Sequence, residues 1–177
     1  MNDDICQIDD ILAPWQSVIG RDFQGYRNHV VRMVTFCQRL RVCRREDVQK
    51  LVIAGCFHDI GLWTRDTLDY LPPSLPPAAE YLAANGLSDW LPEIEQMILL
   101  HHKLRPVEDG LSPLVELFRQ GDLVDFSLGR VCFSLSRAEV REVQGQYPNA
   151  GFHRMLLRRS WRWFLRHPLN PAPMMKW

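Results

Sequence analysis

Apolar residues recur along most of this chain at intervals of three and four, the spacing of one face of an α-helix. β-Branched runs bounded by turn signals are scarce, so strands are not expected. The pattern predicts an all-α protein, a compact helical bundle. We expect helices over residues 5–12, 24–41, 48–61, 77–85, 91–102, 112–126, 136–147 and 151–166.

Several residues mark where the predicted helices begin and end. Asp47 is a suitable N-cap for the helix VQKLVIAGCFHDIG, and Gly61 is a suitable stop for it. The segment LDYLPPSLPPAAEYL carries four prolines, which predict a break in the helix and a surface loop before residue 77. The proline-rich tail, HPLNPAPMMKW, is expected to be extended.

Length, charge and composition restrict the class of protein. With 177 residues we predict a single domain over 1–177, with a core at about 24–130 and the segment 136–177 packed on it. Lys plus Arg and Asp plus Glu both number 21, so the formal net charge is zero. The chain as a whole therefore does not attract a nucleic-acid polymer or an anionic membrane by its charge. There is no apolar run long enough for a membrane span, and the first residues are acidic where a secretory signal is basic. We therefore expect a cytoplasmic protein, and a homodimer is compatible with it.

The five cysteines are scattered and form no C-x-x-C pair. Most of them lie in apolar segments. We expect reduced, buried thiols rather than a disulfide framework or a cysteine-rich zinc site.

The informative feature is a set of ionisable residues on the apolar faces of separate predicted helices. A buried histidine alone is most often satisfied by backbone partners. An ionised carboxylate in a core, however, needs a cation, several donors or a raised pKa. The residues in question are His29, His58 with Asp59, His101 with His102, and Asp122.

Two imidazoles and two carboxylates on faces that pack together form a ligand set for a divalent metal. The mixed nitrogen and oxygen donors suit Mn, Fe, Co, Ni, Zn or Mg. Since no cysteine takes part, the site is expected to keep open positions for water and substrate. The predicted ligands are His29, His58, Asp59 and Asp122.

These residues resemble the HD-domain superfamily, whose helical metal-dependent hydrolases carry a His, then a His-Asp pair, then a distant Asp. The order is met here by His29 in YRNHVVRM, His58-Asp59 in AGCFHDIGLW and Asp122 in FRQGDLVD, over about residues 24–130. Asp125 competes with Asp122 for the last position. We favour Asp122, which follows a small residue and precedes an apolar one, and leave Asp125 to orient a histidine or a basic residue.

At several positions this sequence differs from particular branches of the family, and these differences bear on the number of metals and on the reaction that we expect. A cage for two metals would have to use both His101 and His102, so one metal is favoured over two. The sequence HDIG is shared with cyclic-dinucleotide phosphodiesterases, but their Gly-Tyr-Pro signature is missing. Leu62 stands where the 5′-nucleotidase-like branch often has Glu.

The resemblance implies hydrolysis of a small phosphate ester or nucleotide by metal-activated water. Asp59 is expected to accept a proton from that water, and His101 or His102 to protonate the leaving group. The candidate donors to an anionic substrate are Lys103, Arg105, Arg27 and Arg65.

Two other classes of function stay open. One is different HD-fold chemistry, either hydration or iron-dependent oxygenation of a small substrate, of which oxygenation would require two irons. The other is a non-enzymatic metal-containing or partner-binding module, suggested by the Trp-rich end SWRWFLRHPLNPAPMMKW.

Overall fold

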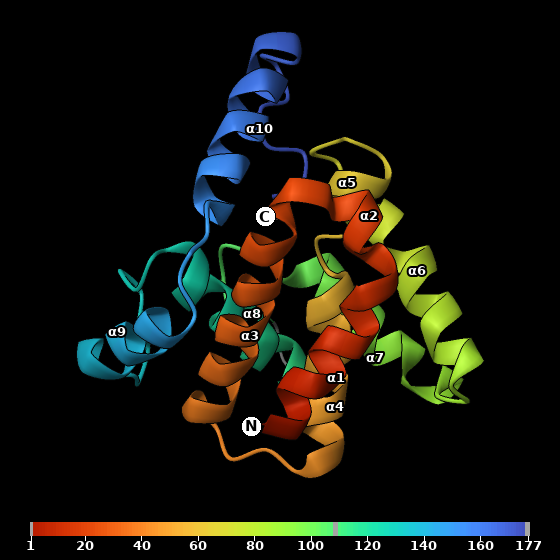
Figure 1. Cartoon of the computed structure of the whole chain (residues 1–177), viewed down its shortest axis with the longest axis vertical. Helices are drawn as coiled ribbons and strands as arrows, with labels where there is room; N and C mark the ends of the chain where they lie inside the picture. Colours follow the sequence, from red (N-terminus) through yellow and green to blue (C-terminus); the bar gives the residue numbers. More distant parts are fainter. Residues whose placement is uncertain (1, 108–109, 176–177) are drawn as a thin grey trace.

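The computed structural model describes residues 2–107 and 110–175, in which helices are joined by turns and loops and no strand occurs (Figure 1). The predicted all-α class is confirmed. In chain order the elements are α1 (Asn2–Leu12), η1 (Ala13–Trp15), α2 (Gln16–Ile19), η2 (Gly20–Asp22), α3 (Phe23–Leu40), α4 (Arg45–Phe57), α5 (Gly61–Thr64), α6 (Leu71–Ala84), η3 (Ser88–Trp90), α7 (Leu91–Leu100), α8 (Pro113–Phe126), α9 (Arg137–Gln146) and α10 (Phe152–Arg166).

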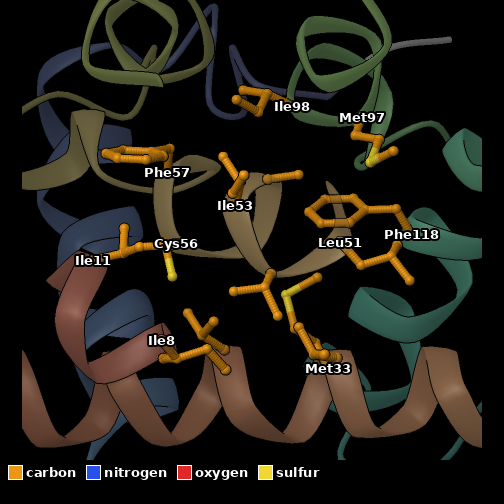
Figure 2. Packing of buried hydrophobic residues seen from close by; sticks show 14 of the residues in the cluster. Ile8, Ile11, Met33, Leu51, Ile53, Cys56, Phe57, Met97, Ile98 and Phe118 are labelled. Carbon is orange, nitrogen blue, oxygen red and sulfur yellow. The ribbon is translucent and has the colours of Figure 1, made fainter. Parts of the chain in front are cut away.

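The long helix α3 is the centre of the bundle, with α1, α4 and α8 packed against it and α7 against α4 and α8. Apolar side chains at helical spacing from each of these elements meet in one core. Figure 2 shows this core, in which Met33 of α3, Leu51 and Ile53 of α4, Met97 and Ile98 of α7, and Phe118 of α8 lie together. Burial of these faces fixes which side of each helix points inward, and hence where its polar residues go.

The approach of α8 to α3 depends on a glycine. A Cβ at Gly121 would collide with the Cys37 sulfur and would lie 2.8 Å from the Met33 carbonyl oxygen, inside any real contact distance. The bare backbone at this position therefore lets the two helices come close. Asp122 is the next residue, so the same close approach brings it against α3.

The predicted loop in the proline-rich segment is wrong, because helix α6 runs through it. Pro72 and Pro73 lie in the first helical turn, where no N–H donor is needed. Pro76 and Pro77 lie inside the helix, and each removes one backbone hydrogen bond. Burial of the inner face offsets this loss, and the Ser74 hydroxyl, which accepts a hydrogen bond from the Gly61 N–H, ties the first turn to α5.

Two predicted helix signals act differently from expectation. Asp47 is the third residue of α4, not its N-cap; its carboxylate accepts a hydrogen bond from the backbone N–H of Arg44. Gly61 does not end the helix that carries the His-Asp pair. The helix ends at Phe57, and Gly61 opens α5, where a Cβ would collide with the Tyr70 carbonyl oxygen.

The cysteines follow the prediction only in part. All five are free, and Cys37 and Cys56 are buried, but Cys6 is exposed and Cys43 and Cys132 are half-buried. The tail forms turns rather than an extended strand, and its last two residues, 176 and 177, lie outside the described part. Of the helices described, none combines the length and the apolar character that crossing a membrane requires.

The Gly121→Ala substitution is expected to lower the free energy of unfolding by roughly 1–3 kcal/mol or more, because the added methyl group has to push α8 away from α3. Urea denaturation monitored by circular dichroism measures this loss. Gly145→Ala is the matched control: it lies in α9 with no atom within 4 Å of the added Cβ, so it should leave stability unchanged or raise it by about 0.5–1 kcal/mol. Equal effects of the two changes would contradict the packing argument.

Candidate metal centre

Six ionisable side chains from four parts of the bundle meet at one end of the core. Five of them are buried, and the sixth, His102, is half-buried. The His-Asp pair and the two adjacent histidines directly follow the last residues of α4 and α7, which end at Phe57 and Leu100. The ends of these two helices therefore determine where the four side chains lie. The six are His29 of α3, His58 and Asp59 after α4, His101 and His102 after α7, and Asp122 of α8.

The first group has its donor atoms close enough to bind one ion. The Nε2 atoms of His29 and His58 are 3.1 Å apart, and Asp59 Oδ2 is 3.3 Å from His58 Nε2 and 4.0 Å from His29 Nε2. Asp122 Oδ1 lies 3.4 Å from His29 Nε2 and 3.9 Å from His58 Nε2. Two imidazole nitrogens and two carboxylate oxygens thus surround one small volume, and His29, His58 and Asp59 together fit a metal ion.

The second group shares Asp59 with the first. Asp59, His101 and His102 each have a ligand atom within 4.8 Å of the others. Asp59 Oδ1 and His101 Nε2, which are 3.7 Å apart, are buried and have no hydrogen-bond partner among the described residues. Buried polar atoms are normally satisfied, so this pair of acceptors indicates a missing cation or donor between them. The carboxylate of Asp59 therefore presents one oxygen to each group.

Backbone carbonyl groups set the tautomer of two histidines. His58 Nδ1 is 2.8 Å from the Gly55 carbonyl oxygen, and His101 Nδ1 is 2.8 Å from the Ile98 carbonyl oxygen. A carbonyl oxygen only accepts, so in each case Nδ1 donates, and in the neutral ring the Nε2 lone pair is free for a metal.

His29 is oriented by a buried ion pair. Its Nδ1 atom lies 2.7 Å from Asp125 Oδ2. Arg32 donates to both oxygens of Asp125, at 2.5 and 2.7 Å, and also to the Tyr147 carbonyl oxygen at 2.9 Å. Although burial disfavours the ionised carboxylate, these hydrogen bonds lower the pKa of Asp125 to about 2. Asp125 thus stays charged and holds the His29 ring from the side opposite to Asp122.

The remaining pKa values show how strongly the groups of the centre interact. Burial raises the pKa of Asp122 to about 8, opposed by His58 and reinforced by Asp59. Burial disfavours charge on His58, but the neighbouring Asp59 and Asp122 raise its pKa to about 9. Burial likewise opposes the charge on Asp59, yet the histidines hold its pKa far below the usual range. The pKa of His102 is lowered to about 4 by burial, so this ring is neutral at pH 7.

The basic residues predicted for substrate binding are spread over the surface. Lys103 is half-buried and Arg105 exposed, both directly after the histidine pair. Arg65 is exposed at the end of α5. Arg27 donates to Asp9 of α1 at 2.5 and 2.8 Å, so its guanidinium is held in an ion pair between α3 and α1.

Two further residues have a structural part in the centre: Arg32, which was not singled out from the sequence, and Tyr70, which the sequence offered, with Trp63 and Tyr81, as a candidate aromatic facing the substrate. Arg32 is fully buried, and the signal for it was a charged residue three positions after His29 on the same apolar face. Tyr70 forms a hydrogen bond between its hydroxyl group and His102 Nε2. The sequence does not predict this contact with His102, because 32 residues separate the two positions.

A comparison with protein-family models gives one result that bears on this arrangement. The model described as HD domain matches residues 26–129, more than half of the chain. This chain belongs to the HD-domain family. No curated protein and no solved structure is matched by it.

The match covers the histidine, the His-Asp pair and the distant aspartate of the HD-domain protein, and leaves α9 and α10 outside. The predicted family and its all-α fold are therefore confirmed. HD domains bind divalent metals, and the buried His/Asp group fits such an ion.

Metal binding to the HD-domain protein at pH 7 is expected to release protons. In the metal-free protein the pKa of His58 is about 9 and that of Asp122 is about 8, so both residues carry a proton at pH 7. A metal ion that binds to them has to displace these protons. Affinity for Mn²⁺ should thus rise from about pH 6 to about pH 9 and level off above both values. Calorimetry in two buffers of different ionisation enthalpy counts the protons. The Asp122→Asn variant should release fewer, and binding without proton release would contradict the assigned protonation.

The Asp125→Asn variant is expected to lose roughly 3–5 kcal/mol of stability, because it leaves the buried Arg32 guanidinium without its counter-charge. Its affinity for Mn²⁺ should fall about 10- to 100-fold, since His29 loses its orienting partner. Asp47→Asn removes a carboxylate that pairs with an exposed arginine and should cost less stability and no metal affinity. Unfolding in urea and metal titration test the two effects, and unchanged affinity in Asp125→Asn would refute the positioning role.

Proposed function

We propose that this HD-domain protein is a metal-dependent phosphohydrolase that acts on a small phosphate ester or nucleotide. The observation that carries the proposal is Asp59, whose two oxygens face two groups of histidines and of which Oδ1 is buried without a partner among the described residues. In our proposal His29, His58, Asp59 and Asp122 hold a divalent ion. Asp59, His101 and His102 offer a second position beside it.

A divalent ion at such a centre activates water as a nucleophile and neutralises charge on phosphoryl oxygens. The protein shields the centre from bulk solvent, since five of the six side chains are buried. Arg32 and Asp125 hold the His29 ring, and the carbonyl groups of Gly55 and Ile98 hold the rings of His58 and His101. These contacts fix the donor atoms before any substrate arrives.

His102 is the member of the centre nearest to solvent. Its ring lies 6.0 Å from that of Phe126, which is about half exposed. We place the entrance for substrate here, with Lys103 and Arg105 as donors to its phosphate group. Burial lowers the pKa of both His101 and His102, so at pH 7 neither ring is the imidazolium that general-acid catalysis requires, and we assign both to binding through the unprotonated nitrogen of the neutral ring.

One observation favours a second candidate function. Two ligand groups that share Asp59 lie next to each other, as iron-dependent oxygenation with two irons would require. Under this alternative the protein would consume oxygen with an organic substrate and release no phosphate. The number of ions bound and the product formed separate the two candidates.

Release of inorganic phosphate from a panel of nucleotides and sugar phosphates tests the proposal, with the protein loaded separately with Mn²⁺, Fe²⁺, Co²⁺, Ni²⁺, Zn²⁺ or Mg²⁺. We expect hydrolysis of at least one substrate class and its loss, together with the bound metal, in Asp59→Asn. Asp89→Asn changes an exposed carboxylate outside the centre and should keep both metal and activity. Oxygen uptake by the iron form without phosphate release would favour the alternative, and full metal content in Asp59→Asn would refute both.

A further inference from the structure

A concave site separate from the metal centre lies between α10, the end of α2 with η2, and the stretch from α5 to residue 68. Its volume is about 710 Å³, the size of a site for a small molecule. None of the six residues of the metal centre lines it. Figure 1 shows α10 extending beyond the body of the bundle, with α2 and α5 near its base. The basic residues that line the cavity are Arg21, Arg158, Arg159, Arg162 and Arg166.

The cavity carries an excess of positive charge. Its acidic lining residues are Asp22 and Asp66, fewer than the five arginines. Asp66 is paired with Arg159 at 2.6 Å, and Asp22 accepts a hydrogen bond from the Trp63 indole N–H. Since the chain as a whole has zero formal charge, this excess is a local feature.

Three of the arginines repel one another along the helix. Arg158, Arg162 and Arg166 are spaced by four residues on one flank of α10, where like charges destabilise a helix. Within the described ranges no carboxylate lies at ion-pair distance from any of the three. The Nε atom of Arg158 is buried and also lacks a hydrogen-bond partner in this part of the chain. An arrangement of this kind is stabilised when an anion binds to it.

The two tryptophans in the wall have their polar atoms occupied. Trp63 donates to Asp22, and the Trp163 indole N–H donates to the Asn170 carbonyl oxygen at 2.8 Å. The guanidinium of Arg159 lies 5.7 Å from the Trp63 ring. The indole rings therefore give the cavity an apolar wall beside its basic row.

We propose that this cavity is a binding site for a small soluble anion with two or more phosphoryl groups, held by Arg158, Arg162 and Arg166. A row of guanidinium groups, one per helical turn, matches a ligand whose charges are distributed along its length. The three arginines lie outside the HD-domain match, which includes part of the opposite wall, and the proposal does not depend on the proposed hydrolase activity.

Anionic lipid headgroups share the phosphate chemistry, and α10 exposes Leu157 and Trp161 outside the cavity. The arginines that carry the proposal, however, line the cavity itself. We therefore commit to a soluble ligand, and vesicles serve as the test of the other source.

Isothermal titration of the full-length protein with tripolyphosphate, without added metal, tests the proposal. We expect one ion bound per chain and a loss of affinity of about tenfold for each guanidinium removed in Arg158→Gln, Arg162→Gln and their double variant. Arg154→Gln is the matched control, because it removes the same charge from the same helix at an exposed position that does not line the cavity. Its affinity should stay within about twofold of the parent, as expected of a surface charge.

Two further arms separate this site from others. Asp59→Asn should bind tripolyphosphate as the parent does, and a loss there would move binding to the metal centre and overturn the proposal. Equal losses in Arg154→Gln and Arg162→Gln would indicate non-specific attraction and overturn it as well. Binding to vesicles of phosphatidylserine and phosphatidylcholine, with no binding of tripolyphosphate, would show a membrane surface in place of the soluble ligand.

Discussion

The structure depends on the ionisable groups that α3, α4, α7 and α8 enclose in one buried volume. Two carboxylates and three buried imidazoles lie within contact of one another, which costs free energy unless charges of opposite sign or a cation compensate. The apolar core beside them supplies the packing that keeps the helices in place despite this cost. The bare backbone of Gly121 is part of that packing, since it sets how closely α8 approaches α3.

The buried pair of Arg32 and Asp125 links this centre to the rest of the fold. Arg32 lies on α3 and Asp125 on α8, and the Arg32 guanidinium also reaches the backbone carbonyl of Tyr147 at the end of α9. One charged group thus joins three elements and orients His29 through Asp125. This is a position where a polar contact in the core confers geometry more than stability.

The two sites that we propose differ in how they handle charge. The metal centre is buried, combines carboxylates with imidazoles, and is built from short side chains whose positions are fixed by helix ends and backbone carbonyls. The cavity beside α10 is positive, lies at the surface and is built from long arginine side chains. The six residues of the first lie within the HD-domain match, whereas three of the arginines that line the second, Arg158, Arg162 and Arg166, lie on α10 outside it.

The sequence by itself determined the helical class and most helix bounds to within a few residues. It placed the polar residues of the candidate centre on the inner faces of their helices, because helical spacing shows which polar side chains share a face with apolar ones. It also suggested a supporting part for Asp125. Tertiary structure decided the rest. Burial of an inner face keeps α6 helical through Pro76 and Pro77, against the local preference of proline. Three contacts join residues from separate parts of the chain, and no local sequence pattern predicts how close such residues lie. They are the contact of Tyr70 with His102, the ion pair of Arg27 with Asp9, and the position of Asp59 between two groups of histidines.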